Sequence, residues 1–289
     1  MFPVLFSLGP VTITSYGVLA VLAFFLGAFV VWKKGREEHF EEEELFDVTL
    51  LATFWGLVVA RIGYIALYWS EFEWNILKWV TLVRNPGLST EGFILGGLVV
   101  VVVFARSKKW LVWNILDVAA LGAVVASVWM YLAAFLNGSG YGVRTSLPWG
   151  ISFPGVEGPR HPTQMYGLLL SVVLVWLLHK IFAQYRTYDW YKGNANEAVG
   201  GLVACVYLVG LGLLFLIMGW LQPGDRMRIW LGLFGVIAGL GLGYMRSGRV
   251  LREDGENIWQ RMRRREVTPE PVRQRKRKRH GIVAGVDVK

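Results

Sequence analysis

Seven long apolar runs constrain the fold of this chain more than any other feature of its sequence. Each reaches or approaches the roughly 20 residues that an α-helix needs to cross a bilayer. Hydrophobic residues make up 54% of the 289 positions, a share that soluble domains of this length rarely reach. The sequence therefore predicts an all-α, polytopic membrane protein with about seven transmembrane helices. The expected spans lie near residues 14–33, 48–68, 93–106, 111–136, 164–183, 198–221 and 227–245.

The third run, "FILGGLVVVVVFA", is short for a full crossing. It is either a short span or the end of a crossing that begins earlier, in a broken or re-entrant segment that includes "ILKWVTLV". A broken crossing is tolerated at membrane depth only where it is buried in protein or lines a wet cavity.

Lys and Arg are unevenly distributed between the two sets of loops, and cytoplasmic loops are the richer in these residues. The richer set carries Lys33, Lys34, Arg36, Arg106, Lys108, Lys109, Lys180, Arg186 and Lys192. The sparser set carries Lys78, Arg84, Arg144, Arg160, Arg226 and Arg228. With an odd number of spans, the N-terminus is then outside and the C-terminus is cytoplasmic. Loops 69–92 and 137–163 are expected to face outward.

Residues 249–289 differ in composition from the rest of the chain. The stretch "RMRRREVTPEPVRQRKRKRHG" has almost no apolar periodicity, so we expect a basic, disordered cytoplasmic tail after a transmembrane domain at 1–248. The tail carries most of the net charge of +9. Basic residues near a membrane surface gain about 1 kcal/mol each from anionic lipid. Contact with nucleic acid is the alternative, and the pattern favours lipid.

Arg61, in "GLVVARIGYIALYW", is a charge within the second span. A charged side chain at the bilayer centre costs about 2.5–3.5 kcal/mol on insertion scales, so a functional role is the default expectation. Here that role is the binding of an anion such as a lipid phosphate. The alternatives are that Arg61 snorkels to the interface or pairs with a carboxylate. Asp117, near the cytoplasmic start of the fourth span, is interpreted as structural.

The fourth span ends in "FLNGSGYGVR". Asn137 closes an apolar helix there, and three spaced glycines follow, from Gly138 to Gly142. One interpretation is a helix C-cap and a tight turn. The other is that Tyr141 and Arg144 bring hydrogen-bond donors to the outer interface.

The octapeptide "RHPTQMYG" at 160–167 precedes the fifth apolar run. Pro162 suits the first position of a helix, which puts His161 at the cap and Gln164 and Tyr166 in the first two turns. Donors at a helix N-terminus beside Arg160 form an anion site, and a histidine there can exchange protons near neutral pH. An interfacial belt of polar and aromatic groups is the alternative.

Polar residues from four spans are expected at one depth. Tyr16 in the first span, Arg61 in the second, Asn137 at the end of the fourth, and Arg160 with His161 at the start of the fifth all fall near the outer leaflet boundary. Their convergence indicates a site for a lipid headgroup and a second substrate.

Three motifs, in order, resemble bacterial prolipoprotein diacylglyceryl transferases. "ARIGY" at 60–64 is similar to that family's Ala-Arg-Leu-Gly-Tyr segment, and "FLNGSGYG" at 135–142 to the core of its long glycine-rich signature. "RHPTQMY" at 160–166 is similar to its Arg-His-Pro-Ser/Thr-Gln-Leu-Tyr segment, and Tyr16 matches a Tyr-Gly near the N-terminus. The resemblance covers roughly residues 10–245.

The resemblance implies an activity and a location. The family transfers a diacylglyceryl group from phosphatidylglycerol to the cysteine thiol of a prolipoprotein signal peptide, and releases glycerol phosphate. We therefore expect a multi-pass transferase of the bacterial inner (plasma) membrane whose partners are phosphatidylglycerol, prolipoprotein signal peptides and membrane lipids. No cofactor and no metal are expected.

The expected site combines the residues of these motifs. Catalytic roles are assigned to His161, Tyr16 and Asn137, and substrate binding to Arg61, Arg144, Arg160, Gly138, Gly142, Gln164 and Tyr166. His161 is chosen on its chemistry and depth, as a substitute for the family's usual histidine.

Several family positions are substituted. Leu95 stands where the family has a histidine, and Met218 where it has a glutamate in the sixth span. The remaining apolar or altered positions are Tyr131, Ala134, Ser139, Leu214 and Leu221. Two interpretations follow: an enzyme that has rebuilt its site around Arg61, Arg144, Arg160 and His161, or a member that binds lipid or signal segments without turnover.

A small transporter or an assembly factor is a third interpretation. Transporters usually carry paired polar groups at the bilayer midplane and often show inverted repeats. Here the midplane is nearly bare apart from Arg61, and an assembly role would depend on the basic tail alone. The polar groups favour an enzyme or a binding protein that works at one interface.

Overall fold

The computed structural model describes residues 2–8, 11–82, 84–185, 200–222 and 226–247. In this part of the chain, seven helices are long and apolar enough to cross a membrane. They are α1 (Ser15–Glu37), α2 (Glu42–Leu67), α5 (Thr90–Ser107), α6 (Val112–Asn137), α7 (Thr163–Gln184), α9 (Leu202–Leu221) and α10 (Arg226–Arg246). The predicted all-α, seven-span architecture is therefore confirmed. The predicted tail at 249–289 lies outside the described residues.

The third span is an unbroken helix of 18 residues. Ser89 caps it, because its side-chain oxygen accepts a hydrogen bond from the Gly92 N–H at 3.1 Å. The segment "ILKWV" forms a separate short helix, α4 (Ile76–Val80), which follows the equally short α3 (Trp69–Phe72). Helix α5 is by itself long and apolar enough to cross a membrane, which agrees with a short third span, and a re-entrant role of "ILKWVTLV" stays a prediction.

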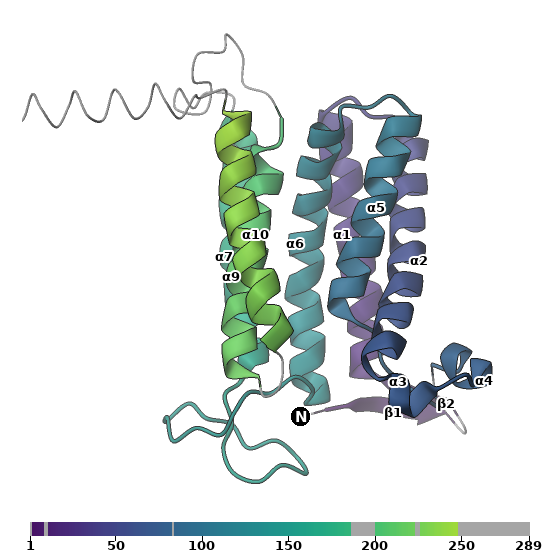
Figure 1. Ribbon diagram of the computed structural model, residues 1–289, viewed down its shortest axis with the longest axis vertical. Coiled ribbons are helices and arrows are strands. Elements are labelled where there is room, and N and C mark those ends of the chain that lie inside the picture. The colour runs from purple at the N-terminus through teal and green to yellow at the C-terminus, as the bar shows by residue number, and fades with distance from the viewer. Residues whose placement is uncertain (1, 9–10, 83, 186–199, 223–225, 248–289) are drawn as a thin grey trace, which may run out of the picture. The chain divides into compact units, whose positions relative to one another are not determined.

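A β-hairpin precedes the first span and was not predicted. Strands β1 (Val4–Leu8) and β2 (Val11–Thr14) are antiparallel, with Val4 opposite Thr14 and Phe6 opposite Ile13 around a bulge. Figure 1 shows the hairpin, α3, α4 and the loop between α6 and α7 at the same end of the helices. We call this the hairpin end, and it is the end that the charge bias predicts to be outside.

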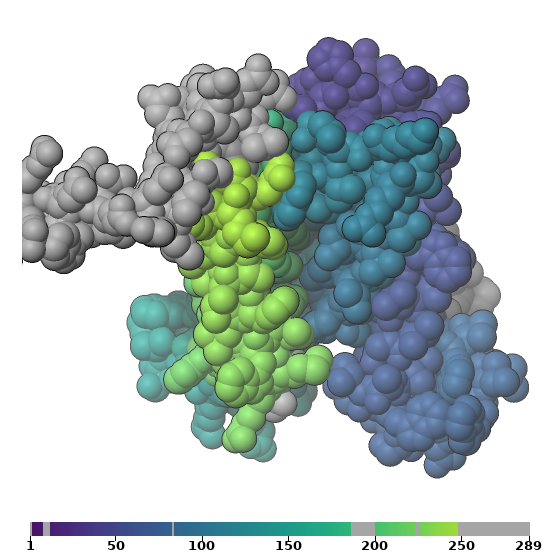
Figure 2. All heavy atoms as spheres, turned by 45° about the horizontal axis from the view of Figure 1, so that its top comes forward, coloured from purple at the N-terminus to yellow at the C-terminus, as the bar shows by residue number. Residues whose placement is uncertain are grey.

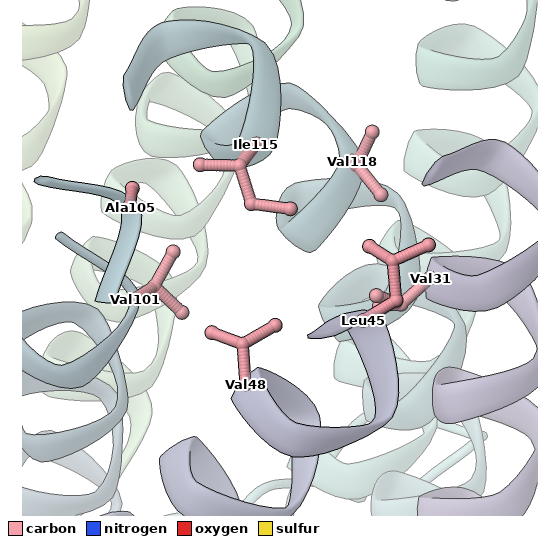
Figure 3. Close-up of a cluster of buried hydrophobic side chains, with 7 residues drawn as sticks. All are labelled: Val31, Leu45, Val48, Val101, Ala105, Ile115 and Val118. Atoms are coloured by element: carbon pink, nitrogen blue, oxygen red, sulfur yellow. The ribbon is translucent and has the colours of Figure 1, made fainter. Parts of the chain in front are cut away.

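Helix α6 lies between two groups of helices (Figure 1). It packs against α1 and α5 on one side and against α7 and α9 on the other, while α2 packs on α5 and α10 packs on α9. At the opposite end from the hairpin, buried aliphatic side chains of four helices fill the interior (Figure 3). They are Val31, Leu45, Val48, Val101, Ala105, Ile115 and Val118.

Glycines allow the closest helix contact, between α9 and α10. A Cβ atom on Gly212 would lie 2.7 Å from the Gly232 carbonyl oxygen, and one on Gly232 would lie 2.7 Å from the Gly212 carbonyl oxygen. Lipid tails are as apolar as leucine, so helices in a membrane associate through such close packing rather than through the hydrophobic effect. The two helices therefore form a tightly packed pair.

Asp117 has a structural role, as predicted. Its carboxylate, 2% exposed, accepts hydrogen bonds from the backbone N–H groups of Gly201 and Ala204, both at 2.7 Å. These N–H groups belong to the start of α9 and have no partner within that helix. A side chain of α6 therefore caps α9 at the end opposite to the hairpin.

Candidate functional site

The turn after α6 begins as predicted. The helix ends at Asn137, and Gly138 follows it in the left-handed conformation, with φ of 74°. Gly140 also has a positive φ, of 76°. A left-handed residue is the usual end of a helix and favours glycine, which has no Cβ to clash.

This turn pairs with the start of α7, so two of the predicted motifs lie together. The Gly142 N–H donates to the His161 carbonyl at 2.9 Å, and the His161 N–H donates to the Val143 carbonyl at 3.1 Å. The end of α9 joins them, because the Val143 N–H donates to the Leu221 carbonyl at 2.7 Å. A Cβ on Gly142 would lie 2.8 Å from both the His161 Cβ and the Leu221 oxygen, so only glycine fits.

Side chains of the 160–166 motif reinforce this contact. Thr163 donates from its hydroxyl to the Gly140 carbonyl, and Gln164 donates from Nε2 to the Ser139 carbonyl at 2.7 Å. Helix α7 begins at Thr163 with Pro162 as its N-cap, so His161 lies one residue before the cap rather than at it. The residue is half-buried beside the turn instead of heading the helix.

His161 is held by an aromatic pair. Its Nδ1 lies 3.2 Å from the Tyr166 hydroxyl oxygen, which also accepts a hydrogen bond from the Trp149 Nε1–H at 2.9 Å. The hydroxyl can accept from both neighbours when His161 carries its proton on Nδ1. In that tautomer the Nε2 atom has a lone pair and can take a proton.

Two buried side-chain atoms have no hydrogen-bond partner in the described structure: Arg160 Nε and Gln164 Oε1. Gln164 is only 2% exposed, and the Arg160 guanidinium lies over the Tyr141 ring at 5.7 Å. A buried polar atom without a partner costs free energy and calls for an explanation. Here one donor and one acceptor, four residues apart in the same motif, lie buried without a partner among the described residues.

Arg61 is buried, at 8% exposure, and is bonded to the chain itself. Its Nε, NH1 and NH2 groups donate to the carbonyls of Trp79, Gly87 and Lys78 at 2.8, 2.9 and 2.7 Å. The guanidinium also lies 4.8 Å from the centre of the Phe72 ring. Arg61 therefore ties Phe72, Lys78, Trp79 and Gly87 to α2, while its expected binding of a lipid phosphate stays a prediction.

The other predicted site residues lie at the hairpin end without such partners. Tyr16 and Asn137 are exposed, and neither side chain hydrogen-bonds to a described residue. Arg144 is exposed, and its Nε would lie 2.9 Å from a Cβ on Gly158. Their proposed roles stay predictions. Within the described ranges, no three His, Cys, Asp or Glu side chains form a group that could hold a metal ion.

Sequence reasoning missed a polar network that joins α5 and α10 to the motifs. Arg228 donates from Nε to Glu91 Oε1 at 2.8 Å and from NH1 to Gln222 Oε1 at 2.5 Å. Gln222 in turn donates to the Gly140 carbonyl at 2.8 Å. Glu91 also accepts from the Ser89 hydroxyl at 2.9 Å. In the sequence, the network is indicated only by a charged residue in the first turn of each of two apolar helices. Arg228 entered the sequence analysis only as one of the loop charges that predict the membrane orientation.

Comparison with known proteins agrees with the motifs. The family model described as prolipoprotein diacylglyceryl transferase matches residues 3–245. The chain belongs to this family. Curated relatives named phosphatidylglycerol–prolipoprotein diacylglyceryl transferase include one from Clostridioides difficile (strain 630), 28% identical over 82% of this chain and 92% of the relative. Others come from Rhizobium meliloti (strain 1021), 32% identical over 62% and 69%, and Synechococcus sp. (strain CC9902), 25% identical over 73% and 76%.

Three residues that the resemblance puts at polar positions of the transferase family share one apolar cluster. Leu214 and Met218 are buried on α9, and Tyr131 of α6 packs against them. Ile94 of α5 and Tyr166 of α7 complete the contact, together with Phe215, Leu170 and Leu211. The interior near the hairpin end is therefore hydrophobic where these residues meet, and its polar groups lie around the motifs and the Glu91–Arg228 pair.

Proposed function

We propose that this chain transfers a diacylglyceryl group from phosphatidylglycerol to the cysteine thiol of a prolipoprotein signal peptide, at its hairpin end. The relatives' names give the reaction class and the substrates. The observation that carries the proposal is the pair of buried, unpartnered atoms Arg160 Nε and Gln164 Oε1 in a motif that also holds His161. The segment that leads into α7 thus offers a cation in Arg160, a hydrogen-bond acceptor in Gln164 and a base in His161. Such groups suit the binding of a phosphate ester and the deprotonation of a thiol.

In the proposed reaction the cysteine sulfur attacks the glycerol carbon that bears the phosphate ester. The C–S bond forms and the C–O bond breaks, with its electron pair passing to the oxygen of glycerol phosphate. His161 takes the thiol proton on Nε2 while its Nδ1–H donates to Tyr166. Arg160 stabilises the negative charge that grows on the leaving phosphate.

We further propose the bacterial inner membrane as the location, with the hairpin end outside. Seven membrane-spanning helices bring the site to one end of the described domain, where both a lipid headgroup and a signal peptide can approach. The basic tail is proposed to lie near anionic lipid on the other side of the membrane.

A reconstitution tests the transfer. Purified full-length protein in phosphatidylglycerol vesicles is incubated with a signal peptide that has a single cysteine, and the mass of the peptide is followed. We expect a gain of one diacylglyceryl group, lost in His161→Ala. His179→Ala is the matched control, because among the described residues His179 hydrogen-bonds to one carbonyl of its own helix, that of Val175, at 2.9 Å.

A second candidate is binding of lipid or signal peptide without turnover. It is favoured by the apolar cluster of Tyr131, Leu214 and Met218 and by the three carbonyls that engage Arg61. An unchanged peptide mass, with phosphatidylglycerol or peptide still bound to the protein, would support this candidate and contradict the transferase.

A further inference from the structure

We propose that Arg228, held by Glu91, is a second residue, besides Arg160, that binds the phosphate ester of a phospholipid headgroup in this chain. The proposal rests on the proposed function for the choice of ligand. Arg228 is the second cation in the first turn of α10, at the hairpin end, and its side chain is 23% exposed. Its partner Glu91, in the first turn of α5, is 16% exposed.

The chemistry of the pair indicates an anion site. The Arg228 guanidinium already binds an oxyanion, because Nε donates to a Glu91 carboxylate oxygen at 2.8 Å. A planar guanidinium binds carboxylate and phosphate with the same parallel N–H groups. When a phosphate replaces Glu91, the carboxylate keeps a donor of its own, the Ser89 hydroxyl at 2.9 Å. The exchange therefore leaves neither charge without a hydrogen bond.

The position of the pair links it to the motifs. Gln222 accepts from Arg228 and donates both to the Gly140 carbonyl at 2.8 Å and toward the Thr163 hydroxyl at 3.4 Å. One side chain therefore separates Arg228 from the glycine-rich turn and from the start of α7. The pair also joins two helices that pack mainly elsewhere, α5 on α2 and α10 on α9.

Arg61 is engaged differently from Arg228. Releasing Arg61 would remove the donors of three backbone carbonyls, whereas Arg228 exchanges one anion for another. The interior beyond the motifs is apolar around Leu214 and Met218 and cannot solvate a phosphate. These contacts favour a headgroup bound at the rim, against Arg228.

Opposite effects of two changes that each remove a charge test the proposal. Full-length protein in detergent is titrated calorimetrically with dihexanoyl phosphatidylglycerol. Arg228→Gln is expected to weaken binding about tenfold or more, and Glu91→Gln to strengthen it about threefold, because the internal competitor for Arg228 loses its charge. If the pair is only a tie between helices, both changes break it and weaken binding alike, which overturns the proposal.

One control variant and two further ligands complete the design. Arg226→Gln removes the same charge from an exposed position two residues away and is expected to change binding little. Dihexanoylglycerol lacks the phosphate. If Arg228→Gln weakens its binding as much as it weakens the binding of dihexanoyl phosphatidylglycerol, the assignment is overturned. Glycerol 1-phosphate, titrated alone, tests whether the site also binds a free phosphate ester. A heat of binding that is lost in Arg228→Gln would show that the free ester is a second ligand of the same site. Because the readout is binding, Arg228 is assigned even if no peptide is lipidated, a result that would contradict only the transferase.

Discussion

Arg61 illustrates, at the residue scale, how a charge within a span is accommodated. Its three donors bind the carbonyls of Trp79, Gly87 and Lys78, in the segment between α2 and α5. The sequence correctly indicates that such a charge needs partners. It could not indicate that the partners are backbone atoms 17 to 26 residues further along the chain.

Arg61→Gln should destabilise the protein by roughly 2–4 kcal/mol, because carbonyls at the edge of the membrane lose their donors. We expect a lower midpoint of thermal unfolding in detergent. Arg106→Gln is the control, since Arg106 is exposed in the last turn of α5. Equal midpoints for the two variants would contradict the bracing role of Arg61.

Tyr166 positions His161 for its proposed work as a base. Removing the hydroxyl in Tyr166→Phe leaves His161 Nδ1 without this neighbour, and the favoured tautomer is lost. We expect the transfer rate at saturating lipid to fall about tenfold or more. An unchanged rate, measured by peptide mass at saturating lipid, would show that the tautomer of His161 is unimportant.

At the element scale, glycine determines how closely α9 and α10 pack. Gly212→Ala would put a methyl group 2.7 Å from the Gly232 carbonyl oxygen and from the Val236 nitrogen, so the helices must separate. We expect a loss of about 1–3 kcal/mol in unfolding free energy. Gly241→Ala, in the partner helix α10, has nothing within 4 Å of the new methyl and should be neutral or slightly stabilising. Similar unfolding midpoints in detergent for both variants would contradict the close packing.

The cap of α9 is a second device at this scale. Asp117→Ala leaves the N–H groups of Gly201 and Ala204 without their acceptor, and the site is too buried for water to replace it freely. A loss of about 1–3 kcal/mol is expected. Asp117→Asn keeps one acceptor oxygen and should recover part of the loss. Thermal unfolding of the three proteins measures this order, and an Asn variant no better than Ala would argue against the cap.

For the whole molecule, sequence pattern predicted the spans well because each apolar run is set by the thickness of the bilayer. Long-range polar contacts were beyond its reach. Glu91 and Arg228 are 137 positions apart, and nothing local to either indicates the other. The short β-hairpin before α1 was missed because it lies before the apolar run that was assigned as a span. The motifs at 138–144 and 160–166 were expected at one depth, and their direct backbone pairing needed the fold.

The orientation of the whole molecule can be tested with its own cysteine content. The single native cysteine, Cys205, is 3% exposed, so a new cysteine can be labelled against a silent background. Glu157→Cys lies in the exposed loop at the hairpin end, and Glu43→Cys lies in the exposed first turn of α2 at the opposite end.

With the N-terminus outside, a membrane-impermeant maleimide added to intact cells should label only Glu157→Cys. Both should react after the membrane is opened. Figure 2 shows one face of the molecule, on which α10 (yellow-green) and α5 (blue-teal) present their side chains. Both helices are long and apolar enough to cross a membrane, so we expect the label to reach the described domain from its two ends. Labelling of Glu43→Cys in intact cells would place the proposed site on the cytoplasmic side, where an exported signal peptide could not meet it after crossing.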